Sequence, residues 1–481
     1  MRRSNLRRML LAVPAAVWGL AGSAQAGPWL EAGDERLRHD LQALADSGAI
    51  HLPSQSWPVP AADVSHALDQ VSYQELGTPV LERALTRART RLRRESRAGR
   101  FESHVGGSLT ANPGPVRGFG GGPREDLELE AGVERMGQRW SGRLQLQWVP
   151  DPEDDQDFRF DGSYAGGILG NWMVSLDTHE RWWGPGWDGS LILSDHARPF
   201  PRLSLQRNYA DAPESPWLAW LGPWRLSAFL GQLEQDREVS SPLVFGTRLD
   251  LAPLPTLQLG LSTVAMLGGS GRDDSLGALL DVYEGSDTDD PADAAGMHIS
   301  AVDARYALPG VPAAIYGQLA QQAPEGGSPE DTMALYGLET TLSLGAARSV
   351  RLFLEHADLT GTSEAAFGRY EAAAYGDGYT YYGRTLGHAL AGEGELTTLG
   401  ALYLTPEGNT WDARLRSGER RVGAGGAAFE DYTEVELGYT ERLADGTSWG
   451  GDAGWREHGA WPLHDETDGE WYLSVHFRQA F

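Results

Sequence analysis

Hydrophobic and polar residues alternate along most of the chain from Phe101 to the C-terminus. In 143–148 leucine or tryptophan alternates with arginine or glutamine, and in 127–134 apolar residues alternate mainly with glutamate. This period of two puts apolar side chains on one face of a strand and polar side chains on the other. The predicted strands cover 101–110, 127–134, 143–148, 158–168, 172–179, 202–207, 224–233, 244–251, 257–267, 297–307, 314–321, 334–342, 350–356, 396–404, 410–416, 431–440, 448–457 and 470–481.

The connections between these strands alternate in length. Gly345–Ser349 is short, 359–394 is long, and the alternation holds nearly throughout. Bacterial outer-membrane barrels have an even number of antiparallel strands, short periplasmic turns and long outer loops, and our count is about 18 strands. The sequence therefore predicts an all-β transmembrane barrel. The connection Asn208–Pro223 is long yet falls on the periplasmic side, so either it packs on the N-terminal helices or a strand is misplaced there.

Before residue 100 the period is helical. Apolar residues recur at helical spacing after Asp34, after Asp63 and after Thr78-Pro79, which predicts three amphipathic helices that start at these points. One face of the third helix is rich in arginine: Arg83, Arg87, Arg91 and Arg94. These arginines either meet solvent or face an acidic barrel mouth. We expect residues 27–99 to form a periplasmic helical plug domain and residues 100–481 to form the barrel.

Residues 1–26 have the pattern of a secretory signal peptide. Arginines precede an apolar run from Met9 to Leu20, and Ala24-Gln25-Ala26 follows it. The run is shorter than the roughly 20 residues that a membrane-spanning helix needs. We therefore expect cleavage between Ala26 and Gly27 and export of the mature chain to the outer membrane.

Composition narrows the function classes. The chain has no cysteine, which excludes a disulfide framework and a thiolate metal site. Its formal net charge of -27 makes nucleic acid an unsuitable partner. The 12 histidines show no HExxH pairing, and the acidic run Asp287–Asp293 lacks the glycine and glutamate of an EF-hand loop. Neither a metal site nor a cofactor is expected.

The C-terminal strand carries the strongest local signal. One of its faces is apolar and the chain stops on an aromatic residue: Trp471, Leu473, Val475, Phe477 and Phe481. A terminal strand of this form resembles the signal that is read by the outer-membrane barrel assembly machine. So long an apolar edge on a soluble protein would invite aggregation, which favours the membrane interpretation.

The segment Arg181–Gly186, with the sequence RWWGPG, is followed by Ser190–Ser194 and Ala197–Pro201. Together with the opening Gly33–Leu41 and the Trp57-Pro58 pair, this block resembles the hallmark of the Wzi capsule-assembly family. The resemblance implies a barrel of about 18 strands, as counted above, plugged by an N-terminal periplasmic helical bundle. It also implies a surface lectin that holds capsular or related exopolysaccharide at the cell surface.

Two predicted outer loops, 180–200 and 359–394, offer candidate sugar contacts. Sugars present apolar C–H faces beside dense hydroxyls, so a binding surface needs aromatic platforms next to charged or amide groups. The candidate polysaccharide-binding residues are Arg181, Trp182, Trp183, Trp187, Asp188, Arg198, Tyr379 and Tyr381. The competing interpretation is that these aromatics belong to the membrane-interface belt. Gly184-Pro185-Gly186 is expected to form a tight turn that can fold the first loop into the lumen.

Three function classes follow. The favoured one is a non-enzymatic, lectin-like protein that attaches or organises polysaccharide, because the helical domain and long loops favour a closed lumen. The alternative is a porin-like diffusion channel for saccharides or other small solutes, which a barrel of this size is wide enough to form. A hydrolase is disfavoured and no catalytic residue is assigned, because Gly446–Gly450 matches a nucleophile-elbow pattern but reads as a hairpin turn. Further expected partners are outer-membrane lipid and lipopolysaccharide, and a monomer is expected.

Overall fold

The computed structural model describes residues 29–95, 99, 101–284, 294–322, 332–360, 369–422, 428–443, 446–461 and 468–481. The expected signal peptide, the cleavage site between Ala26 and Gly27, and the acidic run 287–293 lie outside these residues. Within the described ranges, no helix combines the length and the apolar character that crossing a bilayer requires.

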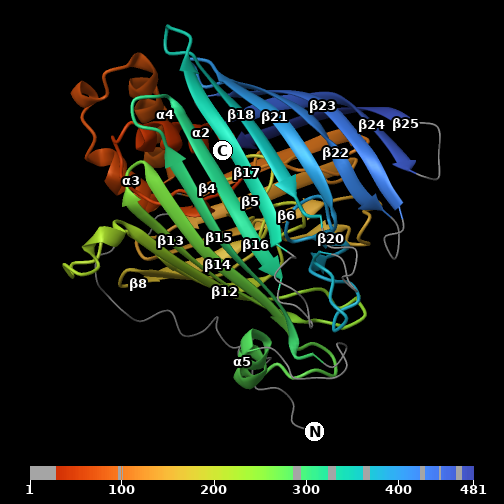
Figure 1. Cartoon of the computed structure of the whole chain (residues 1–481). Helices are drawn as coiled ribbons and strands as arrows, with labels where there is room; N and C mark the ends of the chain where they lie inside the picture. The colour runs from red at the N-terminus through yellow and green to blue at the C-terminus, as the bar shows by residue number, and fades with distance from the viewer. Residues whose placement is uncertain are drawn as a thin grey trace.

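The strands close into one antiparallel barrel (Figure 1). In chain order the barrel strands are β4 (Phe101–Ala111), β5 (Leu127–Met136), β6 (Trp140–Trp148), β7 (Phe158–Arg159), β8 (Tyr164–Leu169), β9 (Trp172–Asp177), β11 (Arg202–Arg207), β12 (Trp224–Gln232), β13 (Leu243–Leu254), β14 (Leu257–Leu267), β15 (Gly296–Ala307), β16 (Ala313–Gln322), β17 (Thr332–Ser343), β18 (Ser349–Asp358), β21 (Gly394–Leu404), β22 (Thr410–Val422), β23 (Ala428–Arg442), β24 (Ser448–Trp461) and β25 (Asp468–Ala480). Because β7 and β8 both pair with β6, they form one interrupted strand and the barrel has 18 strands, which confirms the predicted number. β25 pairs with β4 and closes the barrel, where the Phe481 N–H donates to the Ser103 carbonyl at 2.7 Å.

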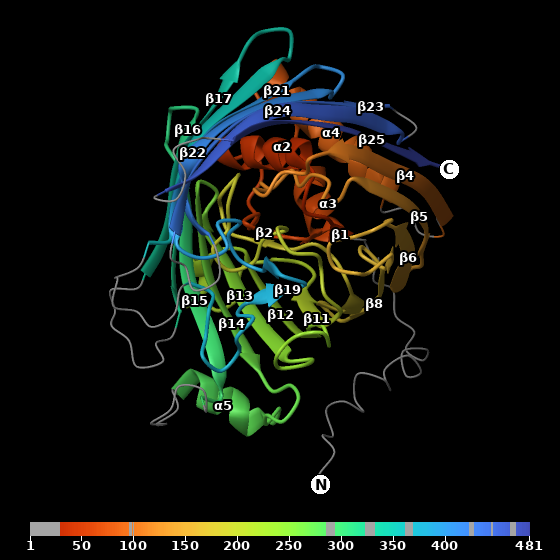
Figure 2. The ribbon, with the colours of Figure 1, turned by 90° about the vertical axis from the view of Figure 1, so that its right-hand side faces the viewer.

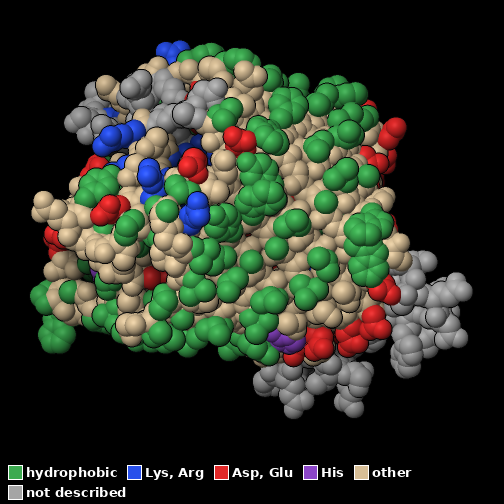
Figure 3. All heavy atoms as spheres, turned by 90° about the horizontal axis from the view of Figure 1, so that it is seen from above, with side chains coloured by type: hydrophobic (Ala, Val, Ile, Leu, Met, Phe, Trp, Pro, Cys, Tyr) green, Lys and Arg blue, Asp and Glu red, His purple; other side chains and the backbone are tan. Residues whose placement is uncertain are grey.

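The two faces of each strand meet different surroundings. Figure 3 shows apolar side chains spread over the outer wall, with charged side chains gathered toward its two ends. The apolar residues of the C-terminal strand all lie on this outer wall and are exposed: Trp471, Leu473, Val475, Phe477 and Phe481. Their neighbours His476 and Arg478 line a cavity inside the barrel. The faces therefore follow the predicted alternation, whereas the role of this strand in assembly stays a prediction.

The N-terminal segment supplies helices that fill one end of the barrel. Its elements are β1 (Trp29–Leu30), α2 (Glu35–Asp46), β2 (Ser56–Trp57), β3 (Val59–Pro60), α3 (Ala61–Asp69), η2 (Tyr73–Glu75) and α4 (Pro79–Glu95). Figure 1 shows the helices at one end of the barrel, and Figure 2 shows them within the ring of strands when viewed from the opposite end. Their apolar faces form one buried core that includes Leu41, Leu68 and Leu85. The three predicted helices are confirmed.

Two of the predicted helix starts are confirmed and one is wrong. Asp34 caps α2 by accepting from the Leu37 N–H at 3.1 Å, and α4 begins at Pro79 as predicted. Asp63, in contrast, lies inside the first turn of α3, which begins at Ala61 after Pro60. Its carboxylate is used elsewhere, as described below.

The arginine-rich face of α4 was expected either to meet solvent or to face an acidic barrel mouth, and its arginines differ from one another in their surroundings. Arg87 forms an ion pair with Asp40 of α2, with Nη2 2.6 Å from Oδ1 and the pair almost completely buried. Arg83 and Arg91 are exposed, and Arg91 lies 3.9 Å from the Asp34 carboxylate. Arg87 therefore joins two helices, whereas Arg83 and Arg91 are exposed as the solvent interpretation expected; the side chain of Arg94 lies outside the described residues.

Three predicted segments need correction. The predicted strand Phe158–Ile168 is interrupted by a turn in which Ser163 N donates to Phe160 O at 3.0 Å and Gly162 has φ of 83°. The connections between the predicted strands 410–416 and 431–440, and between 448–457 and 470–481, are shorter than expected, because β22 to β25 extend into them. Alternation of side chains continues through such turns and strand ends, so the period alone does not mark them.

The unusual connection Asn208–Pro223 packs on the helical domain, which is the first of its two proposed explanations. Ala210 N donates to Asp63 Oδ1 at 3.0 Å, and the Tyr209 ring lies 6.0 Å from the His66 ring. The remaining short elements are β10 (Trp182–Trp183), η3 (Ala219–Leu221), α5 (Leu276–Glu284), β19 (Thr380–Tyr381) and β20 (Arg384–Thr385).

Candidate functional site

The tryptophan-rich segment 181–200 runs through the lumen and joins the helical domain. Its strand β10 pairs antiparallel with β2, which places Trp182 beside Trp57 and Trp183 beside Ser56. The Gly184 N–H then donates to the Gln55 carbonyl at 3.1 Å. Backbone pairing of this kind fixes the depth at which the segment sits in the barrel.

An aromatic cluster surrounds the glycine-proline turn of this segment. The Phe119 ring lies 5.3 Å from Trp57 and 5.5 Å from Trp182, both edge to face. The guanidinium of Arg38 lies 4.3 Å from the ring centres of both Phe119 and Trp187, and it donates to the Pro185 carbonyl at 2.6 Å. Arg38 is buried, so these cation–π contacts form away from water and tie α2 to the segment.

The turn is followed by a contact with the barrel wall. Trp187 Nε1 donates to Glu339 Oε2 at 2.5 Å, and its backbone N–H donates to Glu355 Oε2 at 2.7 Å. Asp188 accepts two bonds from Arg416, each 2.8 Å long. Burial alone would raise the pKa of Asp188, but Arg416 and the neighbouring Arg414 hold it below its usual range. The segment is thus anchored to the helical domain through Arg38 and to the wall through β17, β18 and β22.

The outer loop 369–393 covers this segment at the far end of the barrel. Tyr370 donates to the Leu191 carbonyl at 2.8 Å, and Tyr379 donates to the Ile192 carbonyl at 3.1 Å. The Tyr381 ring lies 5.9 Å from Phe200. These tyrosines belong to one large apolar core in the lumen.

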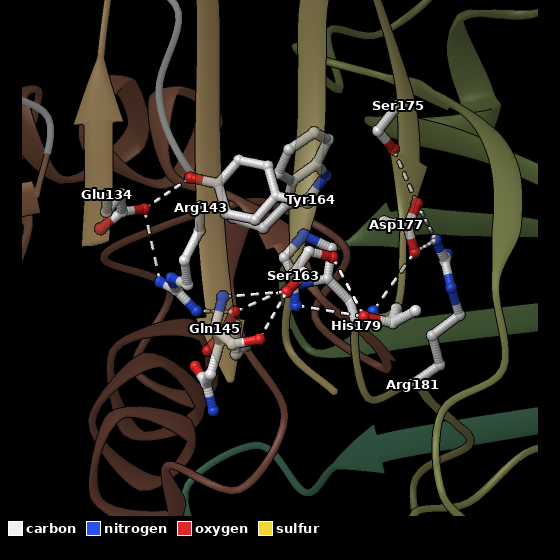
Figure 4. Close-up of polar contacts among 12 residues, drawn as sticks. Glu134, Arg143, Gln145, Ser163, Tyr164, Ser175, Asp177, His179 and Arg181 are labelled. Atoms are coloured by element: carbon white, nitrogen blue, oxygen red, sulfur yellow. Dashed lines mark hydrogen bonds and ion pairs between the residues drawn. The ribbon is translucent and has the colours of Figure 1, made fainter. Parts of the chain in front are cut away.

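The two arginines of the candidate set are held by carboxylates. Arg181 Nη2 lies 3.2 Å from Asp177 Oδ1 and donates to Ser204 Oγ at 2.8 Å; the contact with Asp177 is drawn in Figure 4. Arg198 Nε donates to Asp161 Oδ2 at 2.8 Å, and the same guanidinium bonds to Asp154. Both arginines are buried and therefore serve the packing of the loops.

Ion pairs join the N-terminal segment to the barrel wall. In each pair the wall gives the arginine and the N-terminal segment gives the carboxylate: Arg143 with Glu31, Arg414 with Glu35, Arg305 with Asp46, and Arg225 with Asp63. Figure 4 shows the wall around the first of these, where Arg143 also contacts Glu134. Burial alone would raise the pKa of Glu31, but Arg143 and His179 hold it well below its usual range.

One polar aromatic group reaches the surface at the far end. β19 and β20 form a hairpin whose turn residues, Tyr382 and Gly383, both have positive φ, at 48° and 75°. Tyr382 is only partly buried, and Arg198 lies beneath its ring at 5.4 Å. Beside it Arg384 Nη2 donates to Glu153 Oε2 at 3.0 Å, and Glu153 is largely exposed. A partly exposed ring, a guanidinium and a carboxylate are thus adjacent at the hairpin tip.

Comparison with known proteins decides the family. Residues 102–470 match the family model described as capsule assembly protein Wzi. The chain belongs to this family. It is an outer-membrane β-barrel. The family is described by its role in capsule assembly.

Two relatives cover nearly the same length as this Wzi-family chain. Wzi of Escherichia coli, described as an outer membrane protein involved in group 1 capsule assembly and a carbohydrate-binding β-barrel, is 26% identical, and the likeness covers 94% of this chain and 100% of that one with a TM-score of 0.80. An uncharacterised 55.8 kDa protein in the cps region of Klebsiella pneumoniae is 28% identical over 84% of this chain and 80% of its own length. OccK3 of Pseudomonas aeruginosa is 12% identical with a TM-score of 0.46 over 79% of this chain and 95% of its own, which is too weak to bear on function.

In this Wzi-family barrel the eight candidate residues do not form the exposed platform that we predicted. They are divided between two apolar cores and separate ion pairs, and each is at most 8% exposed: Arg181, Trp182, Trp183, Trp187, Asp188, Arg198, Tyr379 and Tyr381. The membrane-belt interpretation is wrong, because the aromatic side chains among them are buried in the apolar cores and not on the outer wall. Indole and phenol rings are more stable out of water, and the glycine-proline turn lets the loop fold inward. Which residues contact polysaccharide stays a prediction.

Proposed function

We propose that this protein binds capsular or related exopolysaccharide at the outer surface and holds it there without catalysing a reaction. The proposal is supported by membership of the Wzi family and by the likeness to E. coli Wzi, whose description names carbohydrate binding. The observation that carries it is the filled lumen: segment 181–200 and its core cross the barrel, so the far end offers a closed surface. A diffusion channel would need an open path at this point.

We place the sugar contact at the hairpin tip with Tyr382, Arg384 and Glu153. A partly exposed phenol ring gives a sugar an apolar platform, while the guanidinium and the carboxylate offer donors and acceptors for its hydroxyls. Tyr382 is a turn residue of the hairpin and has a positive φ. Its ring contacts the ring of Tyr381, which is part of the lumen core. The surface is therefore organised before a ligand arrives, which reduces the entropic cost of binding.

The test is binding of purified protein to capsular polysaccharide from the same cells. Replacing Tyr382 and Arg384 together by alanine should weaken binding by about tenfold or more, because each lost contact costs on the order of 1–2 kcal/mol. Tyr73→Ala is the matched control, since Tyr73 is a 43% exposed tyrosine on the helical domain at the opposite end. Unchanged binding by the double variant at wild-type folding would move the contact elsewhere, and no binding by the wild-type protein would refute the function.

The same proposal gives each part of the chain a place. Residues 1–26 are removed on export, residues 27–99 plug the periplasmic end, and residues 100–481 form the barrel in contact with outer-membrane lipid and lipopolysaccharide. The barrel assembly machine reads the terminal strand, and the barrel acts as a monomer. Mass spectrometry of the membrane-extracted protein should give Gly27 as its first residue, and an intact Met1 would contradict the export step.

A further inference from the structure

Three carboxylates converge inside the barrel, away from the segment described above. Asp412 of β22, Glu436 of β23 and Asp452 of β24 each offer an oxygen, and these oxygens all lie within 4.8 Å of one another. They line a cavity of about 400 Å³ between the helical domain and the wall. Carboxylates repel one another at this distance, so the arrangement needs an explanation.

The strand register brings the carboxylates together. Asp412 pairs with Gly438 on the next strand, and Gly438 pairs in turn with Asp452, so all three positions face the lumen. A Cβ on Gly438 would lie 2.5 Å from an oxygen of each aspartate. Glu436 is two residues before this glycine and therefore shares its face. The glycine leaves room for the two aspartates to converge over it, and any larger residue would push them apart.

Arginines pair with most but not all of the carboxylates around this cavity. Arg414 and Arg416 form ion pairs with five carboxylates in this region: Glu35, Asp188, Asp412, Glu434 and Glu436. Asp452 adds a sixth carboxylate, and within the described ranges its only ion-pair partner is His476, whose Nδ1 is 3.8 Å away. Further arginines line the cavity, but among the described residues none of them forms an ion pair with the three carboxylates of the cluster: Arg36, Arg117, Arg442 and Arg478. A bound cation would neutralise the negative charge that these half-buried carboxylates bring together.

A second observation points to a ligand at the same place. Ser474 of β25 pairs with Asp452 and lines the same cavity, it is 2% exposed, and its Oγ has no hydrogen-bond partner among the described residues. The hydroxyl of Tyr472, on the same strand face, is buried and unpartnered in the same way. A buried hydroxyl without a partner costs about 1–3 kcal/mol. Both hydroxyls lack the group that would satisfy them.

The donor set selects the class of cation. Every donor in the cluster is an oxygen, which suits a hard cation such as calcium or magnesium. Calcium takes about 6–8 oxygens at roughly 2.3–2.6 Å, so one ion can contact oxygens almost 5 Å apart and fill its remaining positions with water. Magnesium needs a near-ideal octahedron with bonds of about 2.0–2.1 Å, whereas calcium accepts the irregular sets of oxygens that three separate strands provide.

We propose that Asp412, Glu436 and Asp452 bind one calcium ion in the barrel lumen, with Ser474 as a further oxygen ligand or as the partner of a bound water. The ion would join β22, β23, β24 and β25. It would also neutralise charge next to the Arg414–Glu35 pair that holds α2 against the wall. This proposal does not rest on polysaccharide binding.

The test is calcium titration of the purified full-length protein in non-ionic detergent, freed of lipopolysaccharide and stripped of metal with chelator. Calorimetry should give one site per chain, and calcium should raise the unfolding temperature. Asp452→Asn should weaken calcium binding by about tenfold or more while leaving the arginine pairs intact. Glu130→Gln is the matched control, because Glu130 lines the same cavity from β5 and lies 3.8 Å from Arg478.

Several results would overturn the site. No heat of binding up to about 1 mM calcium would do so, since weaker sites fall outside the range of calcium-binding modules. Wild-type affinity in Asp452→Asn, or an equal loss in Glu130→Gln, would place the ion elsewhere. Equal affinity for magnesium would refute the choice of calcium. If Asp452→Asn does not fold, Ser474→Ala provides the second variant, and its calcium affinity should fall severalfold without loss of the barrel.

Discussion

The two halves of the lumen are filled in different ways. At the helical end, the contact between wall and plug depends on ion pairs that each join one wall arginine to one carboxylate of the N-terminal segment. At the far end, the contact depends on a continuous core of tryptophan, tyrosine and aliphatic side chains. An ion pair is lost when either charged partner is removed, whereas an apolar core is weakened when the shape or volume of its side chains changes. The two ends should therefore fail for different reasons when they are mutated.

Removing the tryptophans should have the largest effect. Trp182, Trp183 and Trp187 are at most 1% exposed, and replacing a buried aromatic residue by alanine costs roughly 3–5 kcal/mol. Together these losses match the whole stability of a typical domain, which is about 5–15 kcal/mol. We expect the triple alanine variant to lose its heat-modifiable mobility and its place in the outer membrane.

The control for this variant replaces tryptophans that are exposed instead of buried. Trp217 and Trp220 in the connection after β11 are 87% and 66% exposed, so their replacement by alanine should leave folding unchanged. Trp182 belongs to the core of the helical domain, whereas Trp183 and Trp187 belong to the far-end core. A stable, correctly inserted triple variant would therefore show that neither core depends on these rings.

A charge deletion at the helical end should have the next largest effect. Arg225 is completely buried and bonds to Asp63 at 2.5 Å, so Asp63→Ala leaves a buried cation whose remaining acceptor among the described residues is the Pro53 carbonyl. Breaking a buried pair in this way costs about 3–5 kcal/mol. The unfolding temperature should fall, and protease should cut the helical domain more readily.

The matched variant for this test removes both charges. Asp63→Leu combined with Arg225→Met leaves no unpaired cation and should cost less than Asp63→Ala alone. If the double variant is the less stable of the two, the pair is not the contact that matters at this end.

Bilayer conductance compares the two halves directly. The wild-type protein should conduct poorly, because segment 181–200 crosses the lumen and the ion pairs hold the plug. Asp46→Ala together with Asp63→Ala should add brief openings by loosening the plug, while Tyr382→Ala should not. Large steady conductance of the wild-type protein would contradict both expectations and would support the diffusion channel.

The sequence predicted the wall better than its filling, for a physical reason. On a strand such as β25 the period of two directly sets which side chains meet lipid, so the faces of Trp471 and His476 follow from their positions. The position of an aromatic residue in a loop does not indicate whether its side chain is buried or exposed. Tryptophan and tyrosine occur both in buried loops inside a lumen and at the exposed rim of a barrel. Trp187 was therefore predicted at the surface although it lies in the core.

The ion pairs of the plug were missed because they join distant parts of the chain. Arg305 and Asp46 are 259 positions apart, and no local pattern links them. The wall arginines did carry a signal, since they occupy lumen-facing positions of strands such as β12 and β15 and need carboxylate partners there. The sequence did not indicate which carboxylate pairs with each arginine, because the packing of the helices against the wall determines the pairs.

The smallest expected effect concerns a single carboxyl of the far half, Asp195. It is buried, neither of its oxygens has a hydrogen-bond partner in the described part of the chain, and the nearest cation is Arg117 at 3.9 Å. Burial raises the pKa of Asp195 from 3.8 to about 7. Between these values the folded state holds a proton that the unfolded chain has lost, so stability falls as the pH rises through this window.

Asp195→Asn should remove that loss, because asparagine does not ionise. The variant should unfold at a higher temperature than the wild type at pH 8, by roughly 2–4 °C for each kcal/mol regained, and should match it near pH 4. Asp161→Asn is the control, since the Asp161 carboxylate accepts from Arg198 at 2.8 Å and its loss should destabilise the same region. A gain for Asp195→Asn that is equal at both pH values would show that ionisation is not its cause. No gain at pH 8 would mean that Arg117 already stabilises the charged form in the otherwise apolar half of the lumen.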